Sequence, residues 1–124
     1  MSSAVVGVGA RPGTDSSDIV AAVRKILGDR VCHCLATVDR RAGEPGMIAA
    51  AAELGVPLLG FGTVELRRIV VPNPATRTVE ALGTGSVAEA AAVLACRRCG
   101  GGAVAIVVPK TVIGPVTVAL AVPE

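Results

Sequence analysis

Short apolar runs alternate along this chain with segments that have helical periodicity. Each apolar run ends at a glycine or a polar residue, which is typical of a buried strand that leads into a loop. Three of them are expected as strands: residues 4–8 ("AVVGV"), 34–38 ("CLATV") and 57–61 ("PLLGF"). Helices are expected between them, over residues 18–27 and from Pro45, which suits a first helical turn, to about Leu54, with residues 39–46 as a loop up to the start of that second helix.

Start signals precede the helical segments. Ser86 and Glu89 form an S-x-x-E capping box at the start of a helix expected over residues 86–95. The other signals are Asp15 and Asp18, with capping-box-like spacing before residues 18–27, and Thr63, which can cap a short helix over residues 64–69.

The remaining apolar segments complete an α/β pattern. Residues 78–82 are weakly strand-like, and residues 103–108 and 116–122 are expected as the last strands, joined by a loop that contains Lys110. Strands that alternate with helices predict an α/β sandwich around a single, mainly parallel (mixed) sheet of about five strands, with an antiparallel strand at the end. The chain length of 124 residues predicts a single domain over residues 1–124.

The composition narrows the function classes. Hydrophobic residues make up 52% of the chain, yet Phe61 is the one aromatic residue, so the core must consist of Val, Ile, Leu and Ala. The formal net charge is +2 and there is no basic stripe with interleaved aromatics, which argues against nucleic acid. No apolar run approaches the ~20 residues of a membrane span, and the N-terminus lacks a signal-peptide pattern. We expect a cytoplasmic protein.

The expected topology indicates where a ligand would bind. In open α/β sheets, ligands lie at the carboxyl ends of the strands, where helix N-termini offer free N–H groups and partial positive charge. Arg11, Arg40 and Arg41 strengthen an anion site there, because arginine pairs with carboxylates through parallel hydrogen bonds. Lys110 joins this edge if the strand before it runs parallel to the others. The segments expected at this edge are residues 9–15, 37–46, 61–65 and 83–86.

Two glycine-rich loops lie at this edge. "GVGARPGT" (residues 7–14) matches neither the dinucleotide fingerprint nor a Walker A loop, so a tight turn is the simpler alternative to a ligand site. In "GTGSVAE" (residues 83–89) the capping box explains Ser86 and Glu89, but it does not explain the glycines on both sides of Thr84. The residues expected to bind a ligand are Gly9, Arg11, Gly13, Thr14, Thr37, Arg40, Gly83, Thr84, Gly85, Ser86 and Glu89.

Two acidic residues follow the second strand. Asp39 comes just past the strand end, where acids in α/β folds point into the cleft. Glu44 lies at a helix start, where a carboxylate can equally be only a partner of the helix dipole.

The four cysteines form a C-x-C and a C-x-x-C pair. They are expected at the sheet edge opposite the glycine loops, because one pair precedes the second strand and the other follows the helix that starts at Ser86. A zinc site, redox-active thiols and buried thiols without a further role are the alternatives, and the spacing matches no standard zinc finger. The residues are Cys32 and Cys34, which flank His33, and Cys96 and Cys99.

Several of these segments resemble one family. "GVGARPGT", "LATVDRRAGEPG", "FGTVEL" and above all "GTGSVAEAAAVLA" are similar to the CobE proteins and to the C-terminal domain of CbiG, both of cobalamin biosynthesis. The resemblance runs from Val5 to Val122 and includes the closing "VPKTVIGPVTVALAV". It implies a three-layer α/β/α fold and a role in making the corrin ring. The length favours the stand-alone CobE type, for which a tetrapyrrole-binding or accessory role is implied.

The resemblance leaves several functions open. The first is binding of a carboxylate-rich corrin or precorrin intermediate, with or without cobalt, and no further cofactor. The second is CbiG-like hydrolysis of a precorrin lactone, with Asp39 or Glu44 as a base for water and with Lys110 or the loop amides stabilising an oxyanion. A phosphate- or nucleotide-binding module and a non-catalytic partner subunit are the alternatives of another class. Other cobalamin-pathway enzymes are candidate partners, and the alanine-rich composition is compatible with a homodimer.

Overall fold

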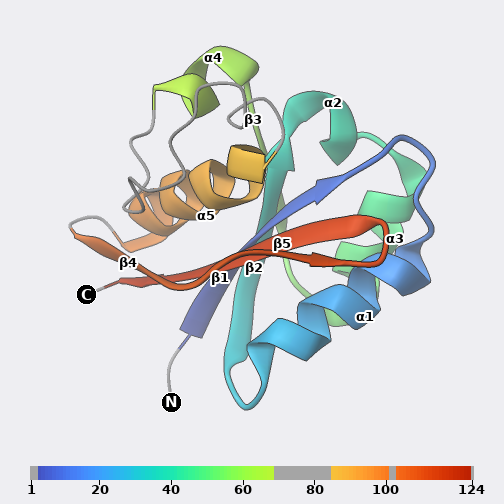
Figure 1. The fold of residues 1–124 in the computed structure, drawn as a ribbon, viewed down its shortest axis with the longest axis horizontal. Coiled ribbons are helices and arrows are strands. Elements are labelled where there is room, and N and C mark those ends of the chain that lie inside the picture. Colours follow the sequence, from blue (N-terminus) through green and yellow to red (C-terminus); the bar gives the residue numbers. More distant parts are fainter. Residues whose placement is uncertain (1–2, 69–84, 101–102, 124) are drawn as a thin grey trace.

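The computed structural model describes residues 3–68, 85–100 and 103–123, in which one sheet carries helices on both faces (Figure 1). The elements in chain order are β1 (Ser3–Ala10), α1 (Ser16–Leu27), β2 (Val31–Val38), α2 (Asp39–Ala42), α3 (Pro45–Leu54), β3 (Leu58–Phe61), α4 (Thr63–Arg67), α5 (Gly85–Gly100), β4 (Val104–Ile113) and β5 (Val116–Pro123). The α/β fold with a single five-stranded mixed sheet is thereby confirmed.

The strand order is β3-β2-β1-β5-β4. Strands β1, β2 and β3 pair in parallel, whereas β5 is antiparallel to both of its neighbours, so β4 runs in the same direction as β1. The turn between β4 and β5 therefore lies at the edge where β1 and β2 end. The register shows this directly, since Thr117 of β5 pairs with Gly9 on one side and with Val112 on the other.

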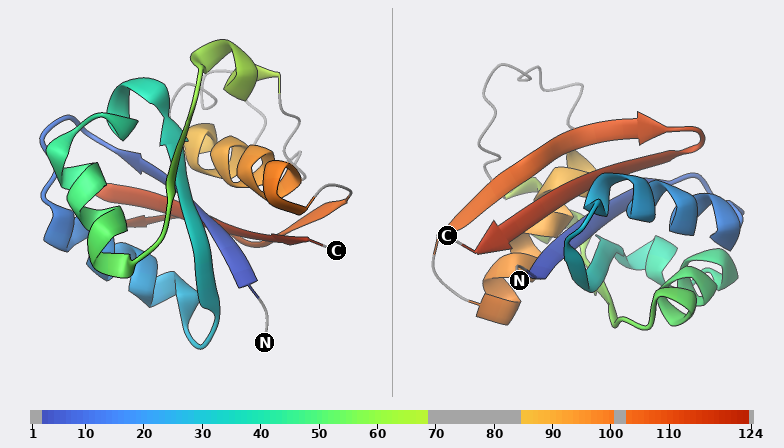
Figure 2. Two further views of the ribbon diagram at one scale, coloured as in Figure 1. Left: turned by 180° about the vertical axis from the view of Figure 1, so that it is seen from behind. Right: turned by 90° about the horizontal axis from the view of Figure 1, so that it is seen from below.

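Helices cover both faces of the sheet (Figure 2), and a hydrophobic core lies on each face. On one face, α1 and α3 contribute residues such as Val23 and Ala50, which pack with Val6 of β1. On the other face, α5 packs its alanines with Val5 and with Phe61 of β3. Successive side chains of β1 therefore pack into the two cores in turn, which explains why this strand is apolar throughout.

Helix α5 lies unusually close to the sheet because both contacting surfaces are small. Its buried face is mainly alanine, and Gly7 of β1 lies beneath Ala88 and Ala92. A Cβ atom at residue 7 would overlap the carbonyl oxygen of Ala88 and would lie 2.9 Å from the backbone nitrogen of Ala92. The helix thus rests on the strand backbone itself at this point.

Several element boundaries differ from those expected. Strand β2 begins at Val31 rather than at residue 34, because backbone pairing with β1 extends through a half-exposed segment that has no apolar pattern. Residues 39–42 form the one-turn helix α2 rather than a loop, and α5 continues through both of its cysteines. Strand β4 runs on to Ile113, so Lys110 lies in a strand and the loop is only residues 114–115. The strand expected over residues 78–82 lies outside the described residues.

The expected helix starts are correct to within two residues. Helix α3 spans the expected Pro45–Leu54, while α4 begins at Thr63 with Gly62 at its N-cap. Asp15 is the N-cap of α1, but its side chain makes no capping hydrogen bond. Helix α5 begins at Gly85, one residue before the expected start at Ser86. In the described residues, no helix combines the length and the apolar character that a membrane crossing requires.

Candidate functional site

A cavity of about 630 Å³ opens at the edge where β1 and β2 end and where the β4–β5 turn lies. This volume falls within the range of small-molecule sites. The described residues that line it come from the ends of β1 and β2, from α2, from the first turns of α5 and from the β4–β5 hairpin: Gly9, Ala10, Arg11, Pro12, Thr37, Val38, Arg40, Arg41, Val87, Val112, Gly114, Pro115 and Thr117.

The cavity combines positive charge with apolar walls. Arg11, Arg40 and Arg41 are the charged residues among the described lining, and each carries a guanidinium. Val87 and Val112 face the same space from α5 and from the hairpin, and Val112 leaves 72% of its surface exposed. Such a site suits a ligand with anionic substituents on an apolar body.

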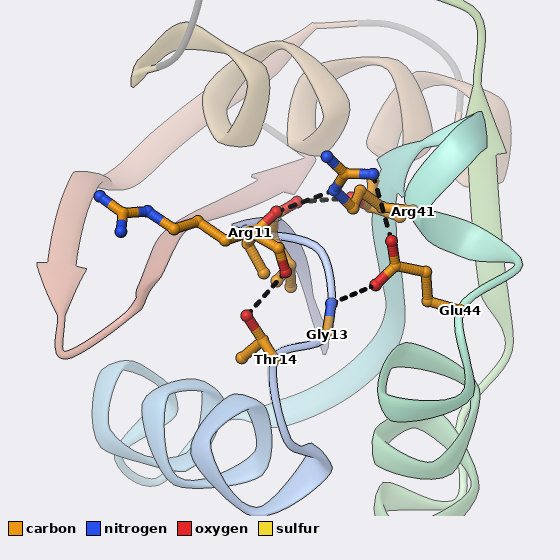
Figure 3. A network of polar contacts seen from close by, with 8 residues as sticks. Arg11, Gly13, Thr14, Arg41 and Glu44 are labelled. Carbon is orange, nitrogen blue, oxygen red and sulfur yellow. Dashed lines mark hydrogen bonds and ion pairs between the residues drawn. The ribbon is translucent and has the colours of Figure 1, made fainter.

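A hydrogen-bond network holds one wall of the cavity together (Figure 3). The Nε of Arg41 donates to the carbonyl oxygen of Ala10 at 3.0 Å, and its Nη1 lies 3.2 Å from Oε2 of Glu44. The other carboxylate oxygen of Glu44 accepts the backbone N–H of Gly13 at 3.0 Å. The hydroxyl of Thr14 donates to the Arg11 carbonyl at 2.7 Å. Residues 10–14 are thereby tied to the α2–α3 connection.

Four of the residues expected to bind a ligand line this cavity: Gly9, Arg11, Thr37 and Arg40. Gly13 and Thr14 belong to the loop beside it and shape its wall through the hydrogen bonds just described. The hydroxyl of Thr37 is buried and donates to the Val8 carbonyl at 2.7 Å, so this residue also joins β2 to β1. Gly83 and Thr84 lie outside the described residues, and Gly85 and Ser86 are the first two residues of α5.

The residues expected to carry catalysis are not brought together at the cavity. Asp39 lies in α2 beside β3, where its Oδ1 is 2.6 Å from the position that a Cβ of residue 60 would take. Glu44 has both oxygens engaged, by Gly13 and by Arg41. Lys110 lies within β4, three residues before the end of that strand at Ile113.

Glu89 has a partner that the capping-box pattern did not indicate. Its side chain is 2% exposed, and Oε2 accepts the backbone N–H of Lys110 at 2.9 Å. At this point β4 has a bulge: Val108 pairs with Leu120 and Thr111 with Val118, so β4 advances three residues while β5 advances two. Glu89 therefore satisfies a backbone donor that the bulge withdraws from the sheet. The side chain of Glu89 thus packs against the backbone of β4, and Glu89 is not among the residues that line the cavity.

The sequence indicated the hairpin wall of the cavity only conditionally, through the Lys110 loop, which was expected at this edge if the strand before it ran parallel to the others. Val112, Gly114, Pro115 and Thr117 are brought to the site because β5 inserts antiparallel beside β1. Arg41, expected only to add charge to this edge, lines the cavity and anchors its wall. The turn at residues 114–115 lies at this edge because β4 runs in the same direction as β1.

The cysteines gather at the opposite end of the sheet, as expected. Cys34 of β2 and Cys96 of α5 are buried in the core between this helix and the sheet, and Cys34 lies next to Cys99. Cys32 instead packs against the core on the other face, because a register shift in the β1–β2 pairing separates it from Cys34. Across residues 3–68, 85–100 and 103–123, no group of three or more His, Cys, Asp or Glu side chains is arranged to hold a metal ion.

Burial makes the thiols of Cys32, Cys34 and Cys96 weak acids. It raises the pKa of Cys32 to about 11, although a hydrogen bond with the backbone of Cys34 acts in the other direction. Burial, with a smaller contribution from Cys99, raises the pKa of Cys34 to about 12, and burial also raises the pKa of Cys96. Thiols of this kind stay protonated at neutral pH, which makes them poor nucleophiles.

The free energy of unfolding is expected to fall as the pH rises above about 9. The unfolded thiols ionise near their ordinary pKa, while the folded ones hold their protons to about 11 and 12, so the unfolded state binds fewer protons in this window. Urea unfolding at pH 7 and pH 10 should show a loss of about 1 kcal/mol for each of Cys32 and Cys34. The Cys34→Ala variant should show a shallower pH dependence, and an unchanged slope would contradict this account.

The chain is similar to known proteins over nearly its whole length. A family model described as "Cobalamin synthesis G C-terminus" matches residues 4–121. The chain is 29% identical to protein CobE of a Sinorhizobium species over 126 residues, which cover 96% of this chain and 79% of that protein.

Two crystal structures share the fold at recognisable sequence identity. One is CobE, a protein from the cobalamin (vitamin B12) biosynthetic pathway, with a TM-score of 0.81, 28% identity and coverage of 99% of this chain and 92% of that one. The other is the cobalamin biosynthesis protein chiG from Agrobacterium tumefaciens, with a TM-score of 0.72, 32% identity and coverage of 98% of both chains.

Proposed function

Because the chain belongs to the cobalamin synthesis G C-terminus family and is a CobE-type cobalamin biosynthesis protein, we propose that it binds a carboxylate-bearing corrin precursor in the cavity. Corrin precursors carry many carboxylates around a flat macrocycle. The three arginines among valine and proline walls are the observation that carries the proposal. Guanidinium groups would pair with the carboxylates, and the apolar walls would contact the macrocycle.

The geometry supports binding more than hydrolysis of a lactone. A hydrolase needs a base within hydrogen-bond reach of its water. Glu44 already accepts hydrogen bonds at both oxygens, and the loss of these bonds would release the cavity wall. Asp39 is packed toward Gly60 of β3 rather than toward the arginines. A carrier or accessory role therefore follows more directly from the described residues than a reaction does.

A titration with cobyrinic acid, a corrinoid with free carboxylate side chains, tests the proposal. Its visible absorption should change in a saturable manner, and Arg11→Ala should weaken binding about fivefold, because an exposed ion pair contributes up to about 1 kcal/mol. Arg11 is exposed on its loop, so the variant should keep the unfolding transition of the parent protein. Arg24→Ala, which removes an exposed arginine of α1 outside the cavity lining, is the matched control.

Two results would contradict the proposal or extend it. Absence of any spectral change with cobyrinic acid, together with saturable binding of a nucleotide, would favour a nucleotide-binding module instead. A change in the mass of a corrin precursor after incubation with the protein would assign a reaction rather than a carrier role.

A further inference from the structure

We infer that Arg41 is the principal carboxylate-binding residue of the cavity and that Glu44 is the residue that positions it. This inference rests on the proposed function and specifies which residues of the same site recognise the ligand. It follows from how each of the two side chains is held (Figure 3).

Arg41 is the cavity arginine with a fixed orientation. Its Nε is held by the Ala10 carbonyl and its Nη1 by Glu44, and only 20% of the side chain is exposed. Figure 3 shows the third nitrogen of the guanidinium, Nη2, directed away from both partners. The contacts that Arg41 makes within the described part of the chain use Nε and Nη1, so the N–H groups of Nη2 can donate to a ligand. An arginine that is already ordered loses less conformational entropy on binding than an extended one.

Arg11 has the opposite character. Its side chain is exposed and extends away from the Arg41–Glu44 pair in Figure 3, and the described contact at this residue uses its backbone carbonyl. A solvated, extended guanidinium must be ordered when it meets a carboxylate, and water screens the pairing. We therefore expect Arg11 to contribute less affinity than Arg41.

Glu44 acts on the ligand only through other residues. It is the N-cap of α3, but its side chain makes no capping hydrogen bond and reaches instead to Gly13 and Arg41. The carboxylate therefore acts across the neighbouring loop and α2 rather than on the N–H groups of its own helix. The loop is also in direct contact with α3, since a Cβ at Gly46 would overlap the Thr14 carbonyl oxygen. Glu44 thus orients Arg41 and fixes the loop that carries Arg11.

The matched pair of ligands for the test is cobyrinic acid and cobinamide, in which the side-chain carboxylates are amides. Arg41→Ala should weaken cobyrinic acid binding about tenfold or more and leave cobinamide binding unchanged, because only the carboxylate form gains a charge-assisted hydrogen bond. The affinity of Arg41→Lys for cobyrinic acid should lie between that of the parent protein and that of Arg41→Ala, since an ammonium keeps the charge but cannot reproduce the two parallel hydrogen bonds of a guanidinium. The ratio of the two affinities is a readout that loss of packing alone would not change.

Glu44 is tested by the same ratio. Glu44→Ala should lower the preference for cobyrinic acid, and it should have a smaller effect in the Arg41→Ala background, because the two residues act as a unit. Glu44→Gln keeps one acceptor oxygen for the Gly13 N–H but turns an NH2 donor toward Nη1 of Arg41, so it should keep the loop contact and still lower the preference for cobyrinic acid. This variant and Arg41→Lys carry the test if the alanine variants do not fold.

The outcomes separate the inference from the function on which it rests. If the parent protein binds neither corrinoid, the proposed function fails and the inference fails with it. If the parent protein binds cobyrinic acid but Arg41→Ala leaves the affinity ratio unchanged, only the assignment of Arg41 is overturned. If Arg41→Ala weakens both ligands equally, Arg41 has a structural role and the inference is again overturned.

Discussion

Replacement of Gly7 by alanine is expected to destabilise the protein by roughly 3 kcal/mol or more. A Cβ at this position would overlap the Ala88 carbonyl oxygen, which belongs to the backbone of α5 and cannot rotate away as a side chain could. The helix would have to move off the sheet, which would open the contact between Ala92 and β1. Urea unfolding followed by circular dichroism measures the change directly.

Gly9→Ala is the matched control for Gly7→Ala. The residue lies two positions further along the same strand, and a Cβ there would meet nothing closer than the Thr117 side chain at 3.8 Å, an ordinary contact. Its free energy of unfolding should stay within about 1 kcal/mol of the parent value. Equal stability of the two variants would mean that α5 can shift without cost.

The second large effect is expected at Glu89. Glu89→Ala should cost roughly 2–3 kcal/mol, because it removes a charged acceptor from the Lys110 N–H at the bulge of β4. The loss should extend to binding, since β4 leads directly into the hairpin that presents Val112 to the cavity. Unfolding and cobyrinic acid titration of the same variant test both consequences.

Glu89→Gln separates the hydrogen bond from the negative charge. The amide oxygen can still accept from the Lys110 N–H, so most of the stability should be retained. If the glutamine variant is as unstable as the alanine variant, the charge itself matters and the bulge contact is not its main role. If both variants match the parent protein, the contact contributes nothing to stability.

The fold could be predicted largely from local patterns. The apolar runs that became β1 and β3 and the period of α1 are properties of adjacent residues, and burial of those residues forces the same elements in the structure. The boundaries of β2 and β4 were wrong because both strands extend through half-exposed residues. There, pairing with a neighbouring strand rather than an apolar pattern maintains the strand.

The location of the site could also be predicted, but only part of its lining. Arg11 and Arg40 follow strand ends, and the rule for α/β sheets places them at one edge. Glu44 was expected as a helix-dipole partner or a base, yet its partners are a backbone N–H and a guanidinium in other segments. Glu89 was expected at the helix cap and is buried against β4. The partner of a charged side chain is not encoded in its own neighbourhood.

The sequence by itself determined the class of fold, the aliphatic character of the two cores and the sheet edge that collects the arginines. These features follow from local periodicity and from composition, which act before any distant contact forms. Only the tertiary structure decided that β5 inserts antiparallel beside β1, which brings the turn at residues 114–115 to the cavity. It also decided that Glu44 spans two loops and that the C-x-C cysteines face different cores. These arrangements depend on strand order and on a register shift, which arise from pairing between segments far apart in the chain.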